Sequence, residues 1–276
     1  MDSEAYSHGH HPSVVRTHAL RTAEDSAPHL IPHLRPGMSV LDVGCGPGTI
    51  TSGLAALVAS GDGVGRATGI DRSTDVIAEA RRLAAANGVR NVAFEAGNVY
   101  GLPFEDASFD VAHAHQVLHH LADPVAALRE MRRVVRPGGI VSVREADYAA
   151  MTWHPPAPEL AQWLRVYDAI SRSNGAEPNA GRHLLEWVLA AGFDAGDLSP
   201  SASAWVYATA QRRHQFGEGW AERVRESYYA DQARDLGLAT RADLEAIAQG
   251  WRRWAADRGS MFLLPSMEII AVVPAG

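Results

Sequence analysis

The segment Met38–Thr51, with the sequence MSVLDVGCGPGTIT, decides how this chain folds. The apolar residues at positions 40, 41 and 43 form a short run, as in a strand buried on both faces of a parallel sheet. Glycines follow at positions 44, 46 and 48, and without Cβ atoms they let the backbone approach a ligand closely. Thr49 is the predicted N-cap of a helix, because apolar residues then recur at helical spacing to about Ala59. This order of strand, glycine turn and helix predicts a nucleotide-like ligand at the carboxyl end of a sheet.

The spacing of the turn indicates which ligand it holds. The dinucleotide pattern G-x-G-x-x-G would need a glycine at position 49, where the chain has Thr49. Asp42 lies two residues before the first glycine, and an acid so close to the turn favours a ligand with a positive group or hydroxyls over a pyrophosphate. The next predicted strand ends on Asp71, whose carboxylate can accept two hydrogen bonds from a ribose diol.

Five motifs follow one another between Met38 and Glu145: VLDVGCGPG, GID, GNVYGLPFEDASFD, LHHLADP and RVVRPGG. In their order and spacing the chain resembles class I S-adenosylmethionine-dependent methyltransferases. The nearest group includes the ubiquinone and menaquinone C-methyltransferases and many natural-product methyltransferases. The resemblance implies an α/β fold with a Rossmann-like, seven-stranded, mostly parallel sheet, helices on both faces, an antiparallel last strand and a helical cap. It also implies S-adenosyl-L-methionine as cofactor and S-adenosyl-L-homocysteine as product.

The resemblance assigns cofactor-binding roles to residues at successive strand ends. These residues are Asp42, Gly44, Cys45, Gly46, Asp71, Arg72, Asn98, Val99 and His115. By family position, the Asn98 side chain accepts from the exocyclic amine of adenine and the Val99 N–H reaches a ring nitrogen. The family's usual residue at this first position is Asp, and an Asn that only shapes a turn is the alternative. His115 and Gln116 are expected to flank the methionine part of the cofactor and the mouth of the acceptor site.

No residue is assigned as catalytic. Methyl transfer is an in-line displacement, so aligning the reactants in a dry cleft can supply much of the acceleration. The sequence has no nucleophile motif, and Cys45 is interpreted as a small filler in the glycine turn. A general base is needed if the acceptor is a phenol or an activated carbon. The candidates follow strands four and five: His119, Glu145, Tyr148 and His154.

Composition excludes several classes of function. The net charge is −7, so no basic stripe for DNA or RNA is expected. The single cysteine excludes an internal disulfide, and no apolar run is long enough to span a membrane. His8, His10 and His11 lack the cysteines or carboxylates of a metal site, and no metal is predicted. We expect a cytoplasmic protein with a small-molecule acceptor and no nucleic-acid or membrane partner, and a homodimer is left open. The composition is rich in Ala and Arg and lacks lysine, which suggests secondary metabolism.

The chain divides into three predicted regions. Residues 1–37 form an N-terminal helical lid segment, in which Tyr6, His18 and Arg21 are lid candidates and a packed surface helix is the alternative. Residues 38–150 form the S-adenosylmethionine-binding core. Residues 151–276 hold the remaining strands, near 203–207 and 267–273, a sheet-packing helix near 186–193, and an inserted substrate cap with helices near 159–172, 212–229 and 241–257. Aromatic residues fall in or beside this cap: Trp153, Trp163, Tyr167, Trp205, Trp220, Tyr228 and Tyr229. They suit an apolar or aromatic acceptor as well as ordinary helix packing.

Two other functions are compatible with parts of this pattern. An NAD-dependent oxidoreductase would use the same strand and turn, but Thr49 in place of the third glycine argues against it. A scaffold or other non-methyltransferase could keep the cofactor fold without transferring a methyl group. Cofactor binding without turnover on a broad acceptor panel would favour the scaffold.

Overall fold

The structure is a computed structural model that describes residues 18–61 and 63–275. The candidate residues Tyr6, His8, His10 and His11 lie outside these ranges.

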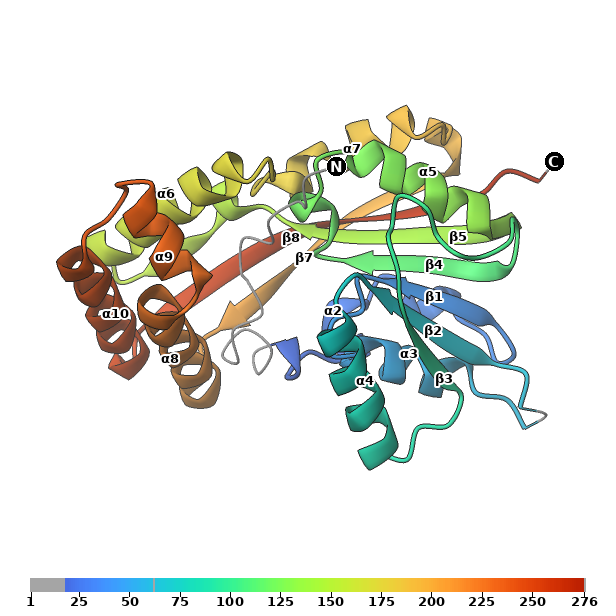
Figure 1. Cartoon of the computed structure of the whole chain (residues 1–276), viewed down its shortest axis with the longest axis horizontal. Helices are drawn as coiled ribbons and strands as arrows, with labels where there is room; N and C mark the ends of the chain where they lie inside the picture. Colours follow the sequence, from blue (N-terminus) through green and yellow to red (C-terminus); the bar gives the residue numbers. More distant parts are fainter. Residues whose placement is uncertain (1–17, 62, 276) are drawn as a thin grey trace.

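One eight-stranded sheet runs through the described residues (Figure 1). Its order is β3-β2-β1-β4-β5-β8-β6, and β7 pairs with the other edge of β8. Neighbouring strands are parallel except at β8, which is antiparallel to β5, β6 and β7. The strands are β1 (Ser39–Val43), β2 (Arg66–Asp71), β3 (Val92–Ala96), β4 (Phe109–His115), β5 (Val135–Ala146), β6 (Thr152–His154), β7 (Leu198–Tyr207) and β8 (Met261–Val272). The predicted Rossmann-like sheet with an antiparallel last strand is confirmed.

The sheet has one strand more than the sequence pattern predicts. β8 is twelve residues long, and β5 pairs only with its later part, from Ser266 to Val272. The first part of the same edge would expose unpaired backbone groups, and β6 pairs there with Met261 to Leu263. Two elements also begin earlier than predicted: α7 (Ala180–Ala190) at Ala180 and β7 at Leu198.

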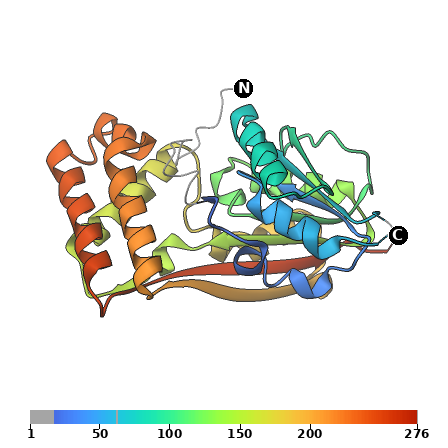
Figure 2. The same ribbon diagram turned by 90° about the horizontal axis from the view of Figure 1, so that it is seen from below.

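Helices cover both faces of the sheet. α3 (Thr49–Val58), α4 (Thr74–Ala86) and the short α2 (Ala23–Ser26) lie on one face, and α5 (Pro124–Val134) and α7 lie on the other (Figures 1 and 2). Both layers bury apolar side chains against the strands, as in the cluster that joins Leu128 and Met131 of α5 to Val141 and Val143 of β5. Four short 3₁₀ turns connect these elements: η1 (Ile31–His33), η2 (Leu118–His120), η3 (Tyr148–Ala150) and η4 (Ala195–Asp197).

Most helix starts follow the local sequence, and one prediction is wrong. Ser73 caps α4 by accepting from the Val76 N–H, and Asp123 caps α5 ahead of Pro124. Thr49, however, is not the N-cap of α3. Gly48 takes that position with a left-handed φ of 76°, which only glycine adopts readily, and no side chain caps the helix. The first N–H groups of α3 therefore have no side-chain cap at the end of the glycine turn.

Four helices pack beyond the carboxyl ends of the parallel strands, where β7 and β8 extend past the rest of the sheet (Figures 1 and 2). They are α6 (Pro158–Ser173), α8 (Ala210–Glu226), α9 (Tyr228–Asp235) and α10 (Arg241–Ala256), and we call them the cap. The single helix predicted near 212–229 is thus two helices. Ser227 separates them, because its hydroxyl donates to the Arg223 carbonyl and accepts from the Tyr229 N–H.

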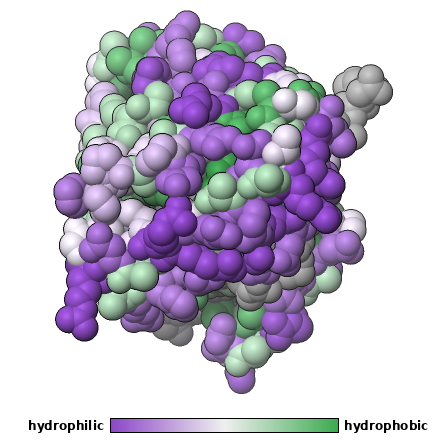
Figure 3. Space-filling view, turned by 90° about the vertical axis from the view of Figure 1, so that its left-hand side faces the viewer, coloured by the Kyte–Doolittle hydropathy of each residue, from purple (hydrophilic) through white to green (hydrophobic). Residues whose placement is uncertain are grey.

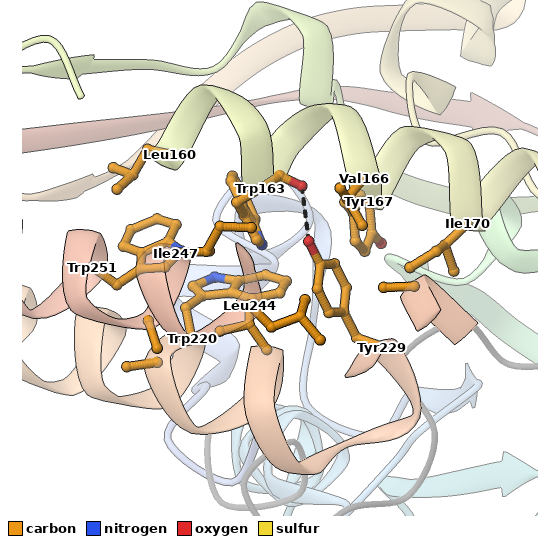
Figure 4. Packing of buried hydrophobic residues seen from close by; sticks show 14 of the residues in the cluster. Leu160, Trp163, Val166, Tyr167, Ile170, Trp220, Tyr229, Leu244, Ile247 and Trp251 are labelled. Atoms are coloured by element: carbon orange, nitrogen blue, oxygen red, sulfur yellow. Dashed lines mark hydrogen bonds between the residues drawn. The ribbon is translucent and has the colours of Figure 1, made fainter. Parts of the chain in front are cut away.

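The cap has an aromatic core of its own (Figure 4). The Trp163 ring lies edge-on to Trp220 and Trp251, with centroids 4.5 and 5.0 Å apart. Tyr229 Oη donates to the Trp163 carbonyl. The outer face of the cap is mostly hydrophilic (Figure 3), as expected when each helix turns its apolar stripe inward. Among the described helices, none is long and apolar enough to cross a membrane.

Candidate functional site

The glycine turn lies where the strand order reverses. β1 pairs with β2 on one side and with β4 on the other. The turn that follows β1 therefore lies between two strands that belong to opposite halves of the sheet. In open α/β sheets ligands bind at such a point. The turn is held by the Ile70 carbonyl, which accepts from the N–H groups of Gly44 and Cys45 at 2.7 and 3.0 Å.

The three glycines of the turn have positive φ angles, but they serve different purposes. A Cβ on Gly44 would lie 2.4 Å from a methyl group of Val117, and one on Gly48 would lie 2.5 Å from the Phe94 ring. These two glycines are required by packing. A Cβ on Gly46 would meet nothing within 4 Å, so Gly46 borders open space. The backbone there can approach a ligand closely, which fits the adenosyl cofactor that the motifs imply.

Asp42 lies beneath the turn and not at its surface. Its side chain is 2% exposed, and Thr51 Oγ1 donates to Asp42 Oδ2 at 2.5 Å. Burial raises the pKa of Asp42 to about 7, although the Thr51 hydrogen bond opposes this shift and the nearby Asp71 charge adds to it. The carboxyl therefore titrates near neutral pH.

Asp71 lies half-buried at the end of β2, facing the turn. Its Oδ2 accepts from the Gly46 N–H at 3.2 Å, and its Oδ1 accepts from the Ser73 N–H at 3.0 Å. Each carboxylate oxygen keeps a further acceptor site for a ligand hydroxyl. Arg72 beside it is exposed.

The end of β3 carries the predicted adenine contacts. Asn98 is exposed, and its Oδ1 accepts from the Tyr100 N–H at 3.0 Å in a turn that closes by a bridge to Gly101. This side chain therefore shapes the turn, as the alternative interpretation holds, and its contact with adenine stays a prediction. Val99 is half-buried beside it.

Cys45 is buried in the turn, between Gly69 and Phe94. Burial raises the pKa of its thiol well above the ordinary value, and the charges of Asp42 and Asp71 add to the shift. The thiol therefore stays protonated at neutral pH, and its position agrees with the interpretation of a small filler.

His115, at the end of β4, is buried beside the Trp205 ring, with centroids 5.4 Å apart. Burial lowers the pKa of His115 well below its ordinary value, and the Arg144 charge adds to the shift. Neither ring nitrogen has a hydrogen-bond partner among the described atoms. Next to this histidine, Arg144 and Glu268 form a buried ion pair at 3.1 Å.

Three of the four candidate bases lie together at the ends of β4 and β5. Glu145 Oε1 accepts from the N–H groups of Val117 and Leu118, and its Oε2 lies 2.6 Å from His119 Nδ1. A carboxylate accepts, so His119 Nδ1 is the donor of this pair. The Tyr148 ring is 6.4 Å from the His119 ring. His154, by contrast, is exposed on β6.

A cavity of about 140 Å³ lies between the sheet edge and the cap. The aromatic residues that line the cavity come from η3, α6, β7 and α8. The lid candidates His18 and Arg21 also line the cavity. The remaining described residues that line it are Leu20, Asp25, Gln116, Tyr148, Met151, Trp163, Trp205, Tyr207, Arg212, Gln215, Phe216, Trp220, Arg223 and Leu264.

Gln116 joins this cavity to the strand ends. It follows β4 directly and has a φ of 53°, a conformation that is unusual for a residue other than glycine and recurs at functional sites. Its N–H donates to the Arg144 carbonyl, and its Oε1 accepts from Arg21 Nη2 at 2.8 Å. Gln116 therefore lines the cavity and lies at the end of β4, the strand that pairs with β1 ahead of the glycine turn.

Sequence reasoning did not select Thr51, Arg212 or Arg223. The last two lie eleven positions apart on α8, which places them on one face of the helix with Phe216 and Trp220. That periodicity was available in the sequence, but the sequence did not indicate which face of this cap helix lines the cavity. Among the described residues, no group of three His, Cys, Asp or Glu side chains is placed to hold a metal ion.

Known proteins resemble this chain over most of its length. The sequence profile of a methyltransferase domain family matches residues 34–192. An uncharacterized methyltransferase of Schizosaccharomyces pombe is 34% identical over 275 residues, which cover 98% of this chain and 96% of that protein. The demethylmenaquinone methyltransferase of Staphylococcus aureus is 37% identical over 134 residues, about half of each chain.

Among solved structures, the [4+2]-cyclase SpnF superimposes with a TM-score of 0.55 at 24% identity, over 95% of this chain and 81% of that one. At this identity the likeness shows the fold alone.

Proposed function

The chain belongs to the class I methyltransferase family and uses S-adenosylmethionine as its cofactor, and from this premise we propose that it methylates a small aromatic or apolar molecule held in the cavity beneath the cap. The observation that carries the proposal is the position of Gln116. This residue lines the cavity and directly follows β4, one of the two strands beside the glycine turn.

We propose that the described residues hold the cofactor from three strand ends. When bound, the cofactor would supply a methyl group on a sulfonium, which the acceptor atom would take in line as the carbon–sulfur bond breaks and the thioether leaves. Gly46 lets the backbone border the ligand, and Asp71 accepts from the ribose hydroxyls while the Gly46 N–H orients its carboxylate. Val99 contributes a backbone N–H toward the adenine. The buried pair of Asp42 and Thr51 supports the turn from below.

The cap and the N-terminal segment contribute the acceptor side of the site in this proposal. Their aromatic side chains exclude water from the cavity and leave a surface on which a flat molecule can stack. Arg21 bonds to Gln116 and so ties the N-terminal segment to the strand end, as expected of a lid. A role in secondary metabolism is part of the same proposal.

The first experiment titrates the purified protein with S-adenosylhomocysteine by calorimetry, with NADH as the parallel control. We expect stoichiometric binding of the first ligand alone. Asp71→Ala should weaken that binding by roughly 1–3 kcal/mol, the cost of removing a charged hydrogen-bond acceptor. Asp235→Ala, an exposed position at the end of α9, is the matched control. Unchanged affinity in the Asp71 variant would exclude its contact with the ribose.

A second experiment follows methyl transfer from labelled S-adenosylmethionine to a panel of aromatic and apolar acceptors. Transfer to at least one aromatic member supports the proposal. Cofactor binding without transfer to any member would favour a binding protein on the same fold.

A further inference from the structure

The cavity beneath the cap is rich in cations, although the chain as a whole has a net charge of −7. Three of the described residues that line it are arginines: Arg21, Arg212 and Arg223. One described lining residue, Asp25, is acidic. Its Oδ1 accepts from the Thr22 N–H and from the Ser26 hydroxyl at the start of α2, so this carboxylate is used in capping a helix.

The arginines approach the cavity from two sides. Arg21 comes from the N-terminal segment and lies over the Trp205 ring, 5.1 Å from its centroid. Arg212 and Arg223 come from one face of α8 and are roughly 16 Å apart along the helix axis. Arg212 is exposed at the start of that helix, whereas Arg223 is buried with its guanidinium 5.0 Å from the Trp220 ring.

Arg21 and the two arginines of α8 act electrostatically on two tyrosines that line the cavity, Tyr148 and Tyr207. Burial raises the pKa of both Tyr148 and Tyr207, and Arg21 is the charge that most opposes the shift at each hydroxyl. Arg223 acts on Tyr148, and Arg212 acts on Tyr207. A negative group that lies beside these two tyrosines would be attracted by Arg21 and by one arginine of α8.

The walls define the rest of the ligand. A cavity of about 150 Å³ lined by apolar side chains binds one benzene ring, and this cavity is of nearly the same volume. Trp163 lines it with a buried indole Nε1 that has no hydrogen-bond partner among the described atoms. An indole N–H is only a donor, so a ligand oxygen would satisfy it.

We infer that the methyl acceptor is an aromatic acid: one ring that lies in the cavity lined by Trp205, Phe216 and Trp220, and a carboxylate that Arg21 and Arg212 bind. This inference rests on the proposed function and adds the charge of the acceptor to it. Guanidinium groups bind carboxylates through paired, charge-assisted hydrogen bonds, which gives the site a strong preference for the anion over a neutral isostere.

The test compares 4-hydroxybenzoate with 4-hydroxybenzamide, two probes of equal shape that differ in charge. Calorimetry is run on the full chain saturated with S-adenosylhomocysteine. We expect the acid to bind at least about tenfold more tightly than the amide, the factor that one charge-assisted hydrogen bond supplies. The advantage of the acid should shrink as salt is raised. Equal or tighter binding of the amide, or binding of neither probe, would overturn the inference.

Variants assign the effect to the named arginines. Arg21→Gln and Arg212→Gln should each reduce affinity for the acid about tenfold and leave affinity for the amide within about twofold. Arg225→Gln is the matched control on α8, because Arg225 pairs with Glu226 and Glu245 and does not line the cavity. Arg212 is exposed, so its variant reports on binding even if Arg21→Gln disturbs the N-terminal segment. Wild-type affinity for the acid in Arg212→Gln and in a folded Arg21→Gln would contradict the assignment.

The same experiment separates this inference from the proposed function. If S-adenosylhomocysteine does not bind the wild-type protein, the proposed site itself is wrong. If S-adenosylhomocysteine binds and the two probes do not differ, the cofactor site is retained and only the anionic acceptor is excluded.

Discussion

Replacing Asp42 by asparagine should stabilise the protein at alkaline pH more than at acidic pH. Asp42 is 2% exposed, and burial raises its pKa from the ordinary 3.8 to about 7. The folded state therefore binds a proton that the unfolded state releases. Stability that depends on this proton is present below the ordinary pKa and is lost as the pH rises through the window from about 4 to 7. Asparagine has a similar shape, carries no charge and can still accept from Thr51.

The magnitude follows from the two pKa values. Relative to a pH below 3.8, the wild-type protein loses about 1.5 kcal/mol of stability at pH 5, where only the unfolded state releases the proton, and about 4 kcal/mol at pH 8, where the folded carboxyl is ionised as well. Asp42→Asn should therefore gain about 2–3 kcal/mol relative to wild type between these two pH values, whatever the substitution costs at either one.

The assay is urea unfolding of both proteins at pH 5 and pH 8 without cofactor. Asp235→Asn, an exposed position, is the control and should shift stability by less than about 0.5 kcal/mol. Thr51→Val removes the hydrogen bond that opposes the pKa shift, so it should enlarge the pH dependence of the wild-type carboxyl. A difference between Asp42→Asn and wild type that does not change with pH would refute the reasoning.

Three further changes test other parts of the structure. Gly46→Ala should weaken S-adenosylhomocysteine binding in calorimetry by about tenfold, or about 1.4 kcal/mol, because the new Cβ would enter the open space where the ligand approaches the backbone; wild-type affinity would contradict this. Trp163→Ala removes a fully buried indole from the cap core and should cost about 3–5 kcal/mol in urea unfolding, whereas a loss below about 1 kcal/mol would mean that the cap core contributes little. Burial lowers the pKa of His113 to about 3, so the wild-type protein should lose stability as the pH falls below the ordinary 6.5. His113→Gln should remove about 2 kcal/mol of that loss at pH 5 relative to pH 7, and equal losses in both proteins would exclude a neutral buried histidine.

Local signals in the sequence located seven of the eight strands of the described sheet, but missed β6. Ser73 and Asp123 cap their helices through local contacts, because a side chain that bonds to an N–H three residues later needs no distant partner. Thr49 was misassigned because the N-cap of α3 depends on a contact with a residue far away in the sequence. A glycine that adopts a left-handed φ at the N-cap is chosen by the packing of Gly48 against Phe94, which the local pattern does not contain.

The candidate site was predicted as positions along the chain, and the structure added their partners. His119 and Glu145 were separate candidates, and the parallel pairing of β4 with β5 brings them within 2.6 Å of each other. Asp42 was predicted to face the ligand, but Thr51 in the next helix and the surrounding burial determine where its carboxyl lies and when it ionises.

The sequence by itself determined the fold, the family and the cofactor, because the glycine turn and the acids at successive strand ends are contiguous motifs with fixed spacing. Only the tertiary structure decided the shape and charge of the cavity. Its described lining extends from His18 to Leu264 and comes from segments that carry no shared motif. Charges on such segments act on one ligand only after the sheet and the cap have brought them together, since electrostatic interactions depend on distance in space and on burial.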